Sequence, residues 1–339
     1  MLHSTGTTGK LSFLPRGTLE MHRMARAWTA KFLPYRDESP LVDAPIHTTP
    51  LLYSSYRRGA MAHHRLLDFL QSDLYGGDPS MILAANPGRL SADGASIGGR
   101  LRVAQSQGER GRIRISPKLM ARRDRFLADQ QNAAAIMDQF LADIVARFSG
   151  RTIMLIGALP TIHHLAAEGL KRGYERVFSA GSYLQLGGGM KGQVLPADWY
   201  QTITRFCGPD TMREGYGMTE LLVGTPLCPA SHFHLAAWAI PFLLDPVTGA
   251  LLPRTGTHQG RFGFYDLHTE TYWGGFLSGD EVTLSRGDDA PCACGRIGPY
   301  VHRDIRRYAE SEGGDDKITC AGAPDAHDRA IDFLLEGIG

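Results

Sequence analysis

Short apolar runs alternate with segments of helical periodicity upstream of about residue 235. The run at residues 152–157 is continuous, aliphatic and ends in glycine, which is typical of a buried strand. Ile136, Phe140 and Ile144 recur at four-residue spacing, which predicts one apolar face of a helix. The order strand, helix, strand predicts parallel α/β units, whose ligands bind at the carboxyl ends of the strands. The expected strands are residues 81–85, 152–157 and 177–181, and the expected helices are residues 124–148 and 162–172.

The pattern changes from about residue 235 onward. Short apolar segments are broken there by Gly, Pro and Asp, which predicts an antiparallel, β-rich region. Near the C-terminus, Ile331, Phe333, Leu334 and Leu335 predict a short helix. The expected strands of the β-rich region are residues 240–244, 260–267, 272–277 and 281–284.

Composition narrows the functional classes. The 339 residues include 36 basic and 35 acidic side chains, a net charge of +1, so no electrostatic footprint for nucleic acid is visible. The chain has neither an apolar run of membrane-spanning length nor a secretion signal, which predicts a cytoplasmic protein without a membrane span. Five cysteines are an odd number, which favours metal binding or thiol chemistry over a disulfide framework.

The first candidate site is a hydroxyl-rich loop at residues 4–10. Its glycines allow backbone N–H groups to face an anion, its hydroxyls add donors and its lysine adds a charge suited to a polyphosphate. The loop differs from the common P-loop, in which a hydroxyl residue follows the lysine. Taken alone, a Ser/Thr/Gly-rich N-terminus is more often a flexible tail. The residues are Ser4, Thr5, Gly6, Thr7, Thr8, Gly9 and Lys10.

Three further motifs support a nucleotide site. In residues 214–220, glycines flank Tyr216, so its ring could lie against a base, while Thr219 offers a hydroxyl to a phosphate and Glu220 a carboxylate to Mg²⁺. In residues 278–280, Asp280 follows a glycine and is suited to the hydroxyls of a ribose. Each motif alone is also compatible with an ordinary turn. The third motif is Gly187, Gly188 and Gly189, which permits close approach of a purine or an acyl chain.

The order of these motifs resembles the adenylate-forming superfamily of acyl-CoA synthetases. Within it, residues 3–10 and 313–322 look most like the acyl-protein synthetase and phenylacetate-CoA ligase branch. The resemblance implies the large N-terminal domain of that superfamily, with parallel α/β subdomains and a β-rich subdomain. It also implies a shortened N-terminus and the lack of a full C-terminal lid domain. The implied parts are a nucleotide- and acyl-binding region at 1–234, a β-rich subdomain at 235–312, and a hinge with a short remnant at 313–339.

The resemblance implies an ATP-dependent ligase that converts a carboxylic acid, most simply a fatty acid, to an acyl-adenylate and then to a thioester. Lys10 and the loop hydroxyls would hold the β- and γ-phosphates, and Thr219 would contact the α-phosphate. Tyr216 and Gly217 would border adenine, Asp280 would bind ribose and Glu220 would bind Mg²⁺. Gly187, Gly188 and Gly189 would border adenine and the acyl pocket. Lys10, Thr219, Glu220 and Cys320 form the implied catalytic set.

The acyl acceptor is open at the level of sequence. Members of the acyl-protein synthetase family pass the acyl group through a cysteine near the C-terminus, where Cys320 lies, although a buried structural cysteine is the alternative. An acyl-acceptor protein such as a reductase would then be the partner. Coenzyme A or a carrier protein would define a different ligase, and a pseudoenzyme would bind ATP without turnover. The acid and the oligomeric state cannot be predicted from the sequence.

A cysteine-rich segment predicts a structural zinc site. Cys292 and Cys294 lie two residues apart beside a glycine, and Cys228 with His232 or His234 could complete a set of four ligands. Some relatives of phenylacetate-CoA ligase look similar here, and His234 matches them better than His232. Unliganded cysteines in turns are the alternative.

One departure from the family pattern concerns arginine. Relatives commonly carry an arginine just before the hinge, where this chain has Gly313. Arg303, Arg306 and Arg307 are candidate substitutes, and Lys317 or Lys10 could replace the lysine of the absent lid.

Overall fold

The computed structural model divides into two compact units, which are described separately. One comprises Met1–Leu14, Arg36–Met212 and Ala323–Gly339, and the other Pro15–Tyr35 and Arg213–Gly322. No helix of the described residues is both long and apolar enough to cross a membrane. The described residues are 2–3, 13–30, 45–92, 132–187, 194–209, 212–221, 224–287 and 291–307.

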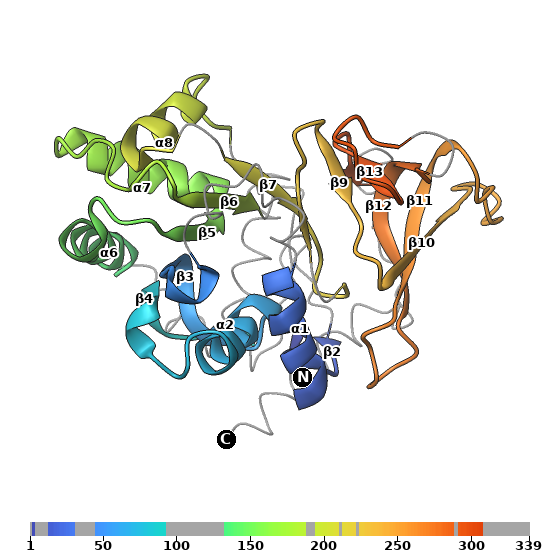
Figure 1. Ribbon diagram of the computed structural model, residues 1–339, viewed down its shortest axis with the longest axis horizontal. Helices are drawn as coiled ribbons and strands as arrows, with labels where there is room; N and C mark the ends of the chain where they lie inside the picture. The colour runs from blue at the N-terminus through green and yellow to red at the C-terminus, as the bar shows by residue number, and fades with distance from the viewer. Residues whose placement is uncertain are drawn as a thin grey trace, which may run out of the picture. The chain divides into compact units, whose positions relative to one another are not determined.

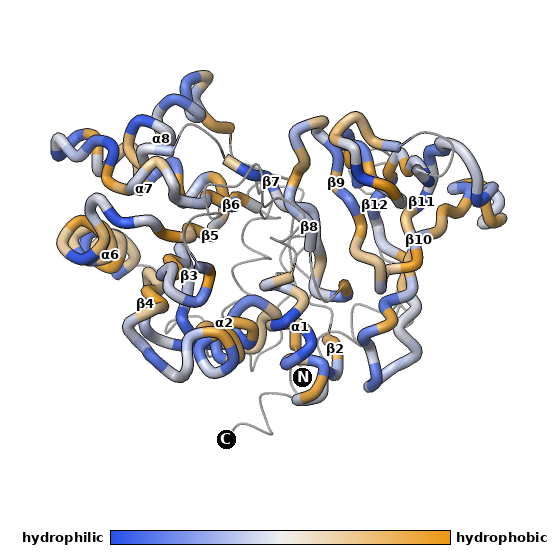
Figure 2. Tube along the Cα trace, in the orientation of Figure 1, coloured by the Kyte–Doolittle hydropathy of each residue, from blue (hydrophilic) through white to orange (hydrophobic). Residues whose placement is uncertain are grey.

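A parallel sheet forms the centre of the first unit (Figure 1). Its strands lie in the order β4-β3-β5-β6, and neighbouring strands are parallel. Hydrophobic residues recur along β5 and along the helix α6 (Figure 2), as expected for elements that share a buried core. The strands are β3 (Leu51–Gly59), β4 (Ile82–Leu90), β5 (Met154–Ala158) and β6 (Tyr183–Gly187).

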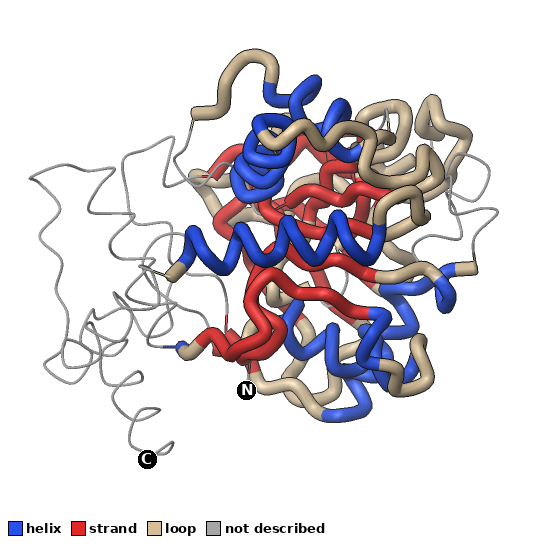
Figure 3. Tube along the Cα trace, turned by 90° about the vertical axis from the view of Figure 1, so that its left-hand side faces the viewer, coloured by secondary structure: helices blue, strands red, loops and turns tan. Residues whose placement is uncertain are grey.

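Helices pack on both faces of this sheet (Figure 3). Leu52, Leu155 and Leu184 are register neighbours on one face, and they share a core with α6, α7 and α8. Successive strand residues alternate between faces, and Tyr53 accordingly contacts His63 and His64 of α2. The helices are α2 (Ala62–Asp73), α6 (Ala133–Phe148), α7 (Leu159–Lys171) and α8 (Trp199–Cys207), with short 3-10 turns η3 (Ile46–Thr48) and η4 (Pro79–Met81). The prediction of parallel α/β units is thus confirmed.

One predicted strand of this unit is wrong. Residues 177–181 form no strand, and β6 begins at Tyr183 instead. The backbone N–H groups of Val177 and Phe178 donate to the carbonyls of Phe206 and Cys207 at the end of α8. The apolar run is buried because its side chains belong to the helical core, while its backbone caps the end of a helix.

The second unit contains the predicted antiparallel sheet. Its strand order is β10-β11-β12-β13-β9, and β14 pairs with β12. The predicted strands at 272–277 and 281–284 are one continuous strand, β12 (Gly275–Ser285). Phe262, Phe264 and Val282 are fully buried in the core of this unit. The other strands are β9 (His232–His234), β10 (Ala239–Leu244), β11 (Thr257–Asp266), β13 (Tyr300–His302) and β14 (Arg306–Arg307); β7 (Arg213–Tyr216) pairs antiparallel with β8 (Thr225–Pro226). The unit also contains the helix α1 (Thr18–Ala30).

Candidate functional site

The predicted phosphate loop lies between two paired strands of the first unit. β1 (Leu2–His3) and β2 (Phe13–Leu14) are antiparallel, with His3 opposite Phe13. The backbone N–H of His3 also donates to the carbonyl of Ala60, 2.8 Å away. The two strands that flank this segment in the sequence are therefore fixed by backbone hydrogen bonds. Residues 4–10 themselves lie outside the described residues, as do Gly188, Gly189, Gly313, Lys317 and Cys320; Gly187 ends β6.

Two residues predicted to hold the nucleoside meet in the second unit. The Tyr216 hydroxyl, at the end of β7, donates to Oδ2 of Asp280 on β12 over 2.9 Å. The residues are only 9% and 5% exposed. Burial, followed by the charge and hydrogen bond of Asp280, raises the pKa of Tyr216 well above its ordinary value, so the phenol remains a donor at neutral pH. The Tyr216 ring also packs against Phe233 and Phe262.

A β-bulge positions Asp280. Arg261 pairs with Glu281 and Gly263 pairs with Leu277, so Phe262 alone faces the three residues 278–280 of β12. The Ser278 hydroxyl donates to the Phe262 carbonyl over 2.9 Å and accepts from the Asp280 N–H over 3.1 Å. Bulges re-aim side chains in this way and are common beside functional sites. The segment expected from sequence to be a turn is therefore a distortion inside a strand.

Arg307 is the arginine that reaches Asp280. Its Nε lies 3.2 Å from Asp280 Oδ1, and the two residues are backbone partners between β14 and β12. Arg303 instead pairs with Glu214, and Arg306 is the backbone partner of Glu281. Of the three candidate substitutes, only Arg307 is therefore placed beside the predicted ribose-binding carboxylate.

The turn that carries Thr219 and Glu220 follows β7 closely. A Cβ on Gly217 would lie 2.8 Å from the Cα of Gly224, so the backbone requires glycine at position 217. Thr219 is half-buried, Glu220 is buried, and the Leu221 N–H donates to the Met218 carbonyl. Thr219 and Glu220 therefore lie on one tight segment, three and four positions after Tyr216.

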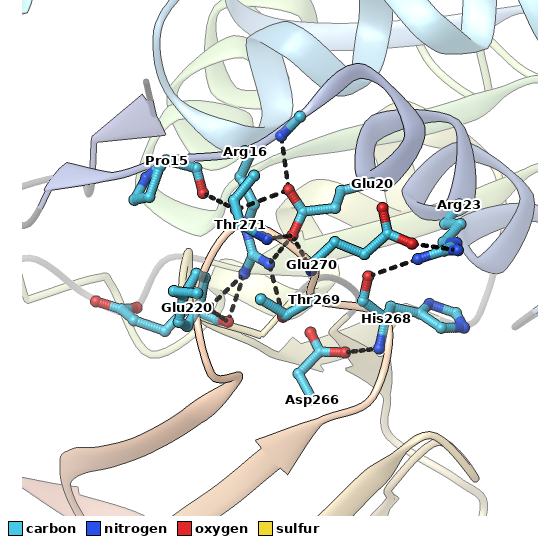
Figure 4. A network of polar contacts seen from close by, with 12 residues as sticks. Pro15, Arg16, Glu20, Arg23, Glu220, Asp266, His268, Thr269, Glu270 and Thr271 are labelled. Atoms are coloured by element: carbon cyan, nitrogen blue, oxygen red, sulfur yellow. Dashed lines mark hydrogen bonds and ion pairs between the residues drawn. The ribbon is translucent and has the colours of Figure 1, made fainter.

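A polar network absent from the sequence prediction supports this turn (Figure 4). The guanidinium of Arg16 donates to the Glu220 carbonyl over 2.7 Å, to the Tyr272 hydroxyl over 2.9 Å and to Thr269 Oγ1 over 2.9 Å. In Figure 4 the Glu220 carboxylate points away from Arg16, so the backbone carbonyl is the group that the arginine holds. Glu20, in the first turn of α1, lies 3.4 Å from Arg16 Nη1 and completes the network. No local sequence motif signals these contacts, which span up to 256 positions.

The structure brings all four predicted zinc ligands together. The sulfur atoms of Cys228, Cys292 and Cys294 and a ring nitrogen of His234 lie within 4.8 Å of one another. Cys228 Sγ is 3.9 Å from Cys292 Sγ, and Cys294 Sγ is 3.2 Å from His234 Nε2. Zinc–ligand bonds of about 2.3 Å to sulfur and 2.1 Å to nitrogen give tetrahedral edges of about 3.8 and 3.6 Å. The donor set therefore fits a closed tetrahedral site.

The protonation states of this cluster have clear physical causes. Burial, followed by the positive charges of Arg296 and His232, lowers the pKa of His234 to about 4, so its imidazole is neutral at pH 7, as a ligand must be. Burial, with the adjacent Cys294 and Cys228 thiols, raises the pKa of Cys292 to about 11. His232 lies beside the set, with Nδ1 3.2 Å from Cys292 Sγ.

The fold is an α/β arrangement with a parallel sheet in one unit and an antiparallel sheet in the other, which agrees with the predicted fold class. No protein-family model matches the chain, and no curated protein matches it. Solved structures that it resembles include ATP-bound MatB from Rhodopseudomonas palustris, with a TM-score of 0.43 and 16% identity over 89% of this chain and 46% of that one.

Two other similar structures are a luciferase-like enzyme and a fatty-acid-CoA ligase. The luciferase-like enzyme of the mealworm Zophobas morio has a TM-score of 0.44 and 11% identity over 88% of this chain and 55% of that one. A long-chain-fatty-acid-CoA ligase (FadD1) of Archaeoglobus fulgidus has a TM-score of 0.42 and 9% identity over 84% and 47%. The chain spans about half the length of these structures.

Proposed function

We propose that the chain activates a carboxylic acid with ATP, forming an acyl-adenylate and pyrophosphate, and then transfers the acyl group to a thiol. The hydrogen bond from Tyr216 to Asp280 is the observation that carries this proposal. It joins two motifs 64 positions apart that were separately predicted to hold adenine and ribose. Arg307 adds a cation to the same carboxylate.

The residues assigned to the first step bind and orient ATP. Asp280 accepts hydrogen bonds from the ribose, Tyr216 borders the base, and Thr219 donates to the α-phosphate. Glu220 would hold Mg²⁺, which when bound neutralises phosphate charge. The substrate carboxylate is already a nucleophile, so alignment with the α-phosphate and charge neutralisation supply the catalysis. Lys10 and the loop hydroxyls hold the β- and γ-phosphates in this proposal.

The acceptor we favour is a protein thiol, with a fatty acid as substrate, as in acyl-protein synthetases. The resemblance of residues 3–10 and 313–322 to that branch supports this assignment, and Cys320 is the proposed acyl-carrying residue. Mass spectrometry after incubation with acid and ATP should then find the acyl group on Cys320. Product that forms only with added coenzyme A would instead define an acyl-CoA ligase, and product that forms only with a carrier protein would define a loading enzyme.

Acid-dependent exchange of labelled pyrophosphate into ATP tests the first step. A panel of fatty and aromatic acids should include one that supports exchange, and Glu220→Ala and Lys10→Ala should each reduce it at least tenfold. Glu175→Ala is a matched control, because this exposed carboxylate pairs with Arg205 on the surface of the first unit. Absence of exchange and of hydroxylamine-trapped product with every acid would contradict the proposal and leave a nucleotide-binding pseudoenzyme.

We also propose that Cys228, His234, Cys292 and Cys294 bind one structural zinc ion. The tetrahedral fit of the four donors supports this site, and four protein ligands leave no open position for water. Purified protein should contain one zinc per chain, and Cys292→Ser should lose it. Cys207→Ala should retain the metal, because Cys207 is buried in the other unit. Zinc far below one equivalent in the unsubstituted protein would contradict the assignment.

A further inference from the structure

Arg16 is a buried cation with an unusual set of partners. Its side chain is 0% exposed, and its hydrogen-bond partners among the described residues all belong to the second unit. The guanidinium also lies over the ring of Tyr272, 5.0 Å from the centroid. Burying such a charge is unfavourable unless it is paired and hydrogen-bonded. The groups that pair with Arg16 and offset this cost are therefore the groups whose positions it fixes.

Glu20 neutralises this charge and is itself held firmly. Its carboxylate accepts from the N–H groups of Gly17 and Glu270 over 2.6 and 2.8 Å and from the Thr271 hydroxyl over 2.9 Å. Burial alone would raise the pKa of Glu20, but these hydrogen bonds outweigh it and lower the pKa. The carboxylate is therefore ionised at neutral pH, and it fixes the start of α1 to the loop at residues 269–272.

One donor of Arg16 and the hydroxyl of Tyr272 converge on a single acceptor. The Glu220 carbonyl receives Arg16 Nη2 over 2.7 Å and the Tyr272 hydroxyl over 3.1 Å. The two donors also hold each other in place, because Arg16 Nη2 donates to the Tyr272 hydroxyl oxygen over 2.9 Å. A carbonyl held by two fixed donors cannot rotate without losing both bonds. The peptide that follows Thr219 and carries Glu220 is thus clamped from outside its own loop.

We propose that Arg16 is a positioning residue for Mg·ATP: it fixes the Glu220 carbonyl, and thereby the directions in which the Thr219 and Glu220 side chains meet the phosphate and the metal. This inference rests on the proposed function. Arg16 lies outside the predicted nucleotide motifs, yet it would affect how tightly Mg·ATP binds. Lysine at position 16 would keep the charge but lose the planar fork that serves Tyr272, Thr269 and Glu220 together.

The test compares Arg16→Lys with Arg23→Gln. Arg23 lies on α1, seven residues after Arg16, and contacts the neighbouring loop through the His268 carbonyl and Glu270, but none of the described residues of the Glu220 turn. Calorimetric titration without acid should give a dissociation constant for Mg·ATP at least tenfold higher in Arg16→Lys and unchanged in Arg23→Gln. The Mg²⁺ concentration for half-maximal pyrophosphate exchange should rise similarly, while the KM for the acid should not.

Tyr272→Phe provides a second variant in case Arg16→Lys does not fold. It removes one donor to the Glu220 carbonyl and leaves Arg16 in place, so Mg·ATP should bind about threefold more weakly, by loss of one neutral hydrogen bond. Wild-type affinity in folded Arg16→Lys, or in Tyr272→Phe, would overturn the inference while leaving the proposed function intact. A wild-type protein that neither binds Mg·ATP nor catalyses exchange would overturn both.

Discussion

Removal of one hydroxyl from Tyr216 gives a quantitative test of the Tyr216–Asp280 contact. Tyr216→Phe keeps the ring and its packing against Phe233 and Phe262, so almost no apolar contact is lost. Asp280 is 5% exposed, and Arg307, which also pairs with it, is 43% exposed and therefore partly screened by solvent. A hydrogen bond to a charged group contributes about 1.5–3 kcal/mol. We expect Tyr216→Phe to lower the free energy of unfolding by about 2 kcal/mol.

Denaturant titration measures this change, with Tyr265→Phe as the control. Tyr265 is 49% exposed on β11, in the sheet that contains Asp280, and its substitution should change the free energy by less than about 0.5 kcal/mol. A double-mutant cycle with Asp280→Asn should return a coupling of about 1–2 kcal/mol. A loss below about 0.5 kcal/mol in Tyr216→Phe, or a coupling near zero, would show that the Tyr216–Asp280 hydrogen bond does not stabilise the fold.

Three further predictions concern stability and metal content. Burial, followed by nearby positive charges, lowers the pKa of His64 to about 3 from 6.5, so the unfolded chain binds more protons than the folded chain between these pH values. The free energy of unfolding should therefore fall by about 1.4 kcal/mol for each pH unit below pH 6.5. In His64→Leu, denaturant titrations at several pH values should show a weaker dependence of this free energy on pH. Gly169→Ala should destabilise the protein by about 1–3 kcal/mol in the same assay, because the new Cβ would clash with the Phe206 ring, although alanine ordinarily favours a helix; equal or higher stability would contradict the geometry. A strong chelator should release zinc and lower the melting temperature of the wild type but not of Cys292→Ser, and an equal shift in both would exclude a structural metal.

The parallel sheet could be predicted because its central strand is apolar on both faces. Met154 and Leu155 of β5 are both fully buried, so the sequence shows a continuous apolar run. The same signal misled at Val177 and Phe178, which are buried but pair with the end of α8. An apolar run reports burial and does not reveal the partner of its backbone groups. Residues 278–280 were expected to form a turn because a bulge and a turn use the same small and polar residues.

Some residues of the candidate site could be predicted from the sequence, and others could not. Cys292 and Cys294 are close in sequence, and their spacing beside a glycine led to the four residues that the structure groups together. Tyr216 and Asp280 could be proposed as partners only from the order of their motifs. Arg16 could not be found at all, because it lies just before α1 and meets Glu220 across 204 positions without any local pattern. Contacts between residues so far apart in the sequence depend on the fold and produce no periodic pattern in the sequence.

Isotope transfer can show directly whether a substrate carboxylate attacks the α-phosphate of ATP. An acid that supports pyrophosphate exchange is labelled with ¹⁸O in its carboxylate and incubated with the protein, Mg·ATP and a thiol acceptor. The bridging oxygen leaves with the nucleotide when the thiol takes the acyl group, so mass spectrometry should find one ¹⁸O in each AMP formed. Label in inorganic phosphate together with ADP, or AMP that carries no label, would contradict adenylation by this chain.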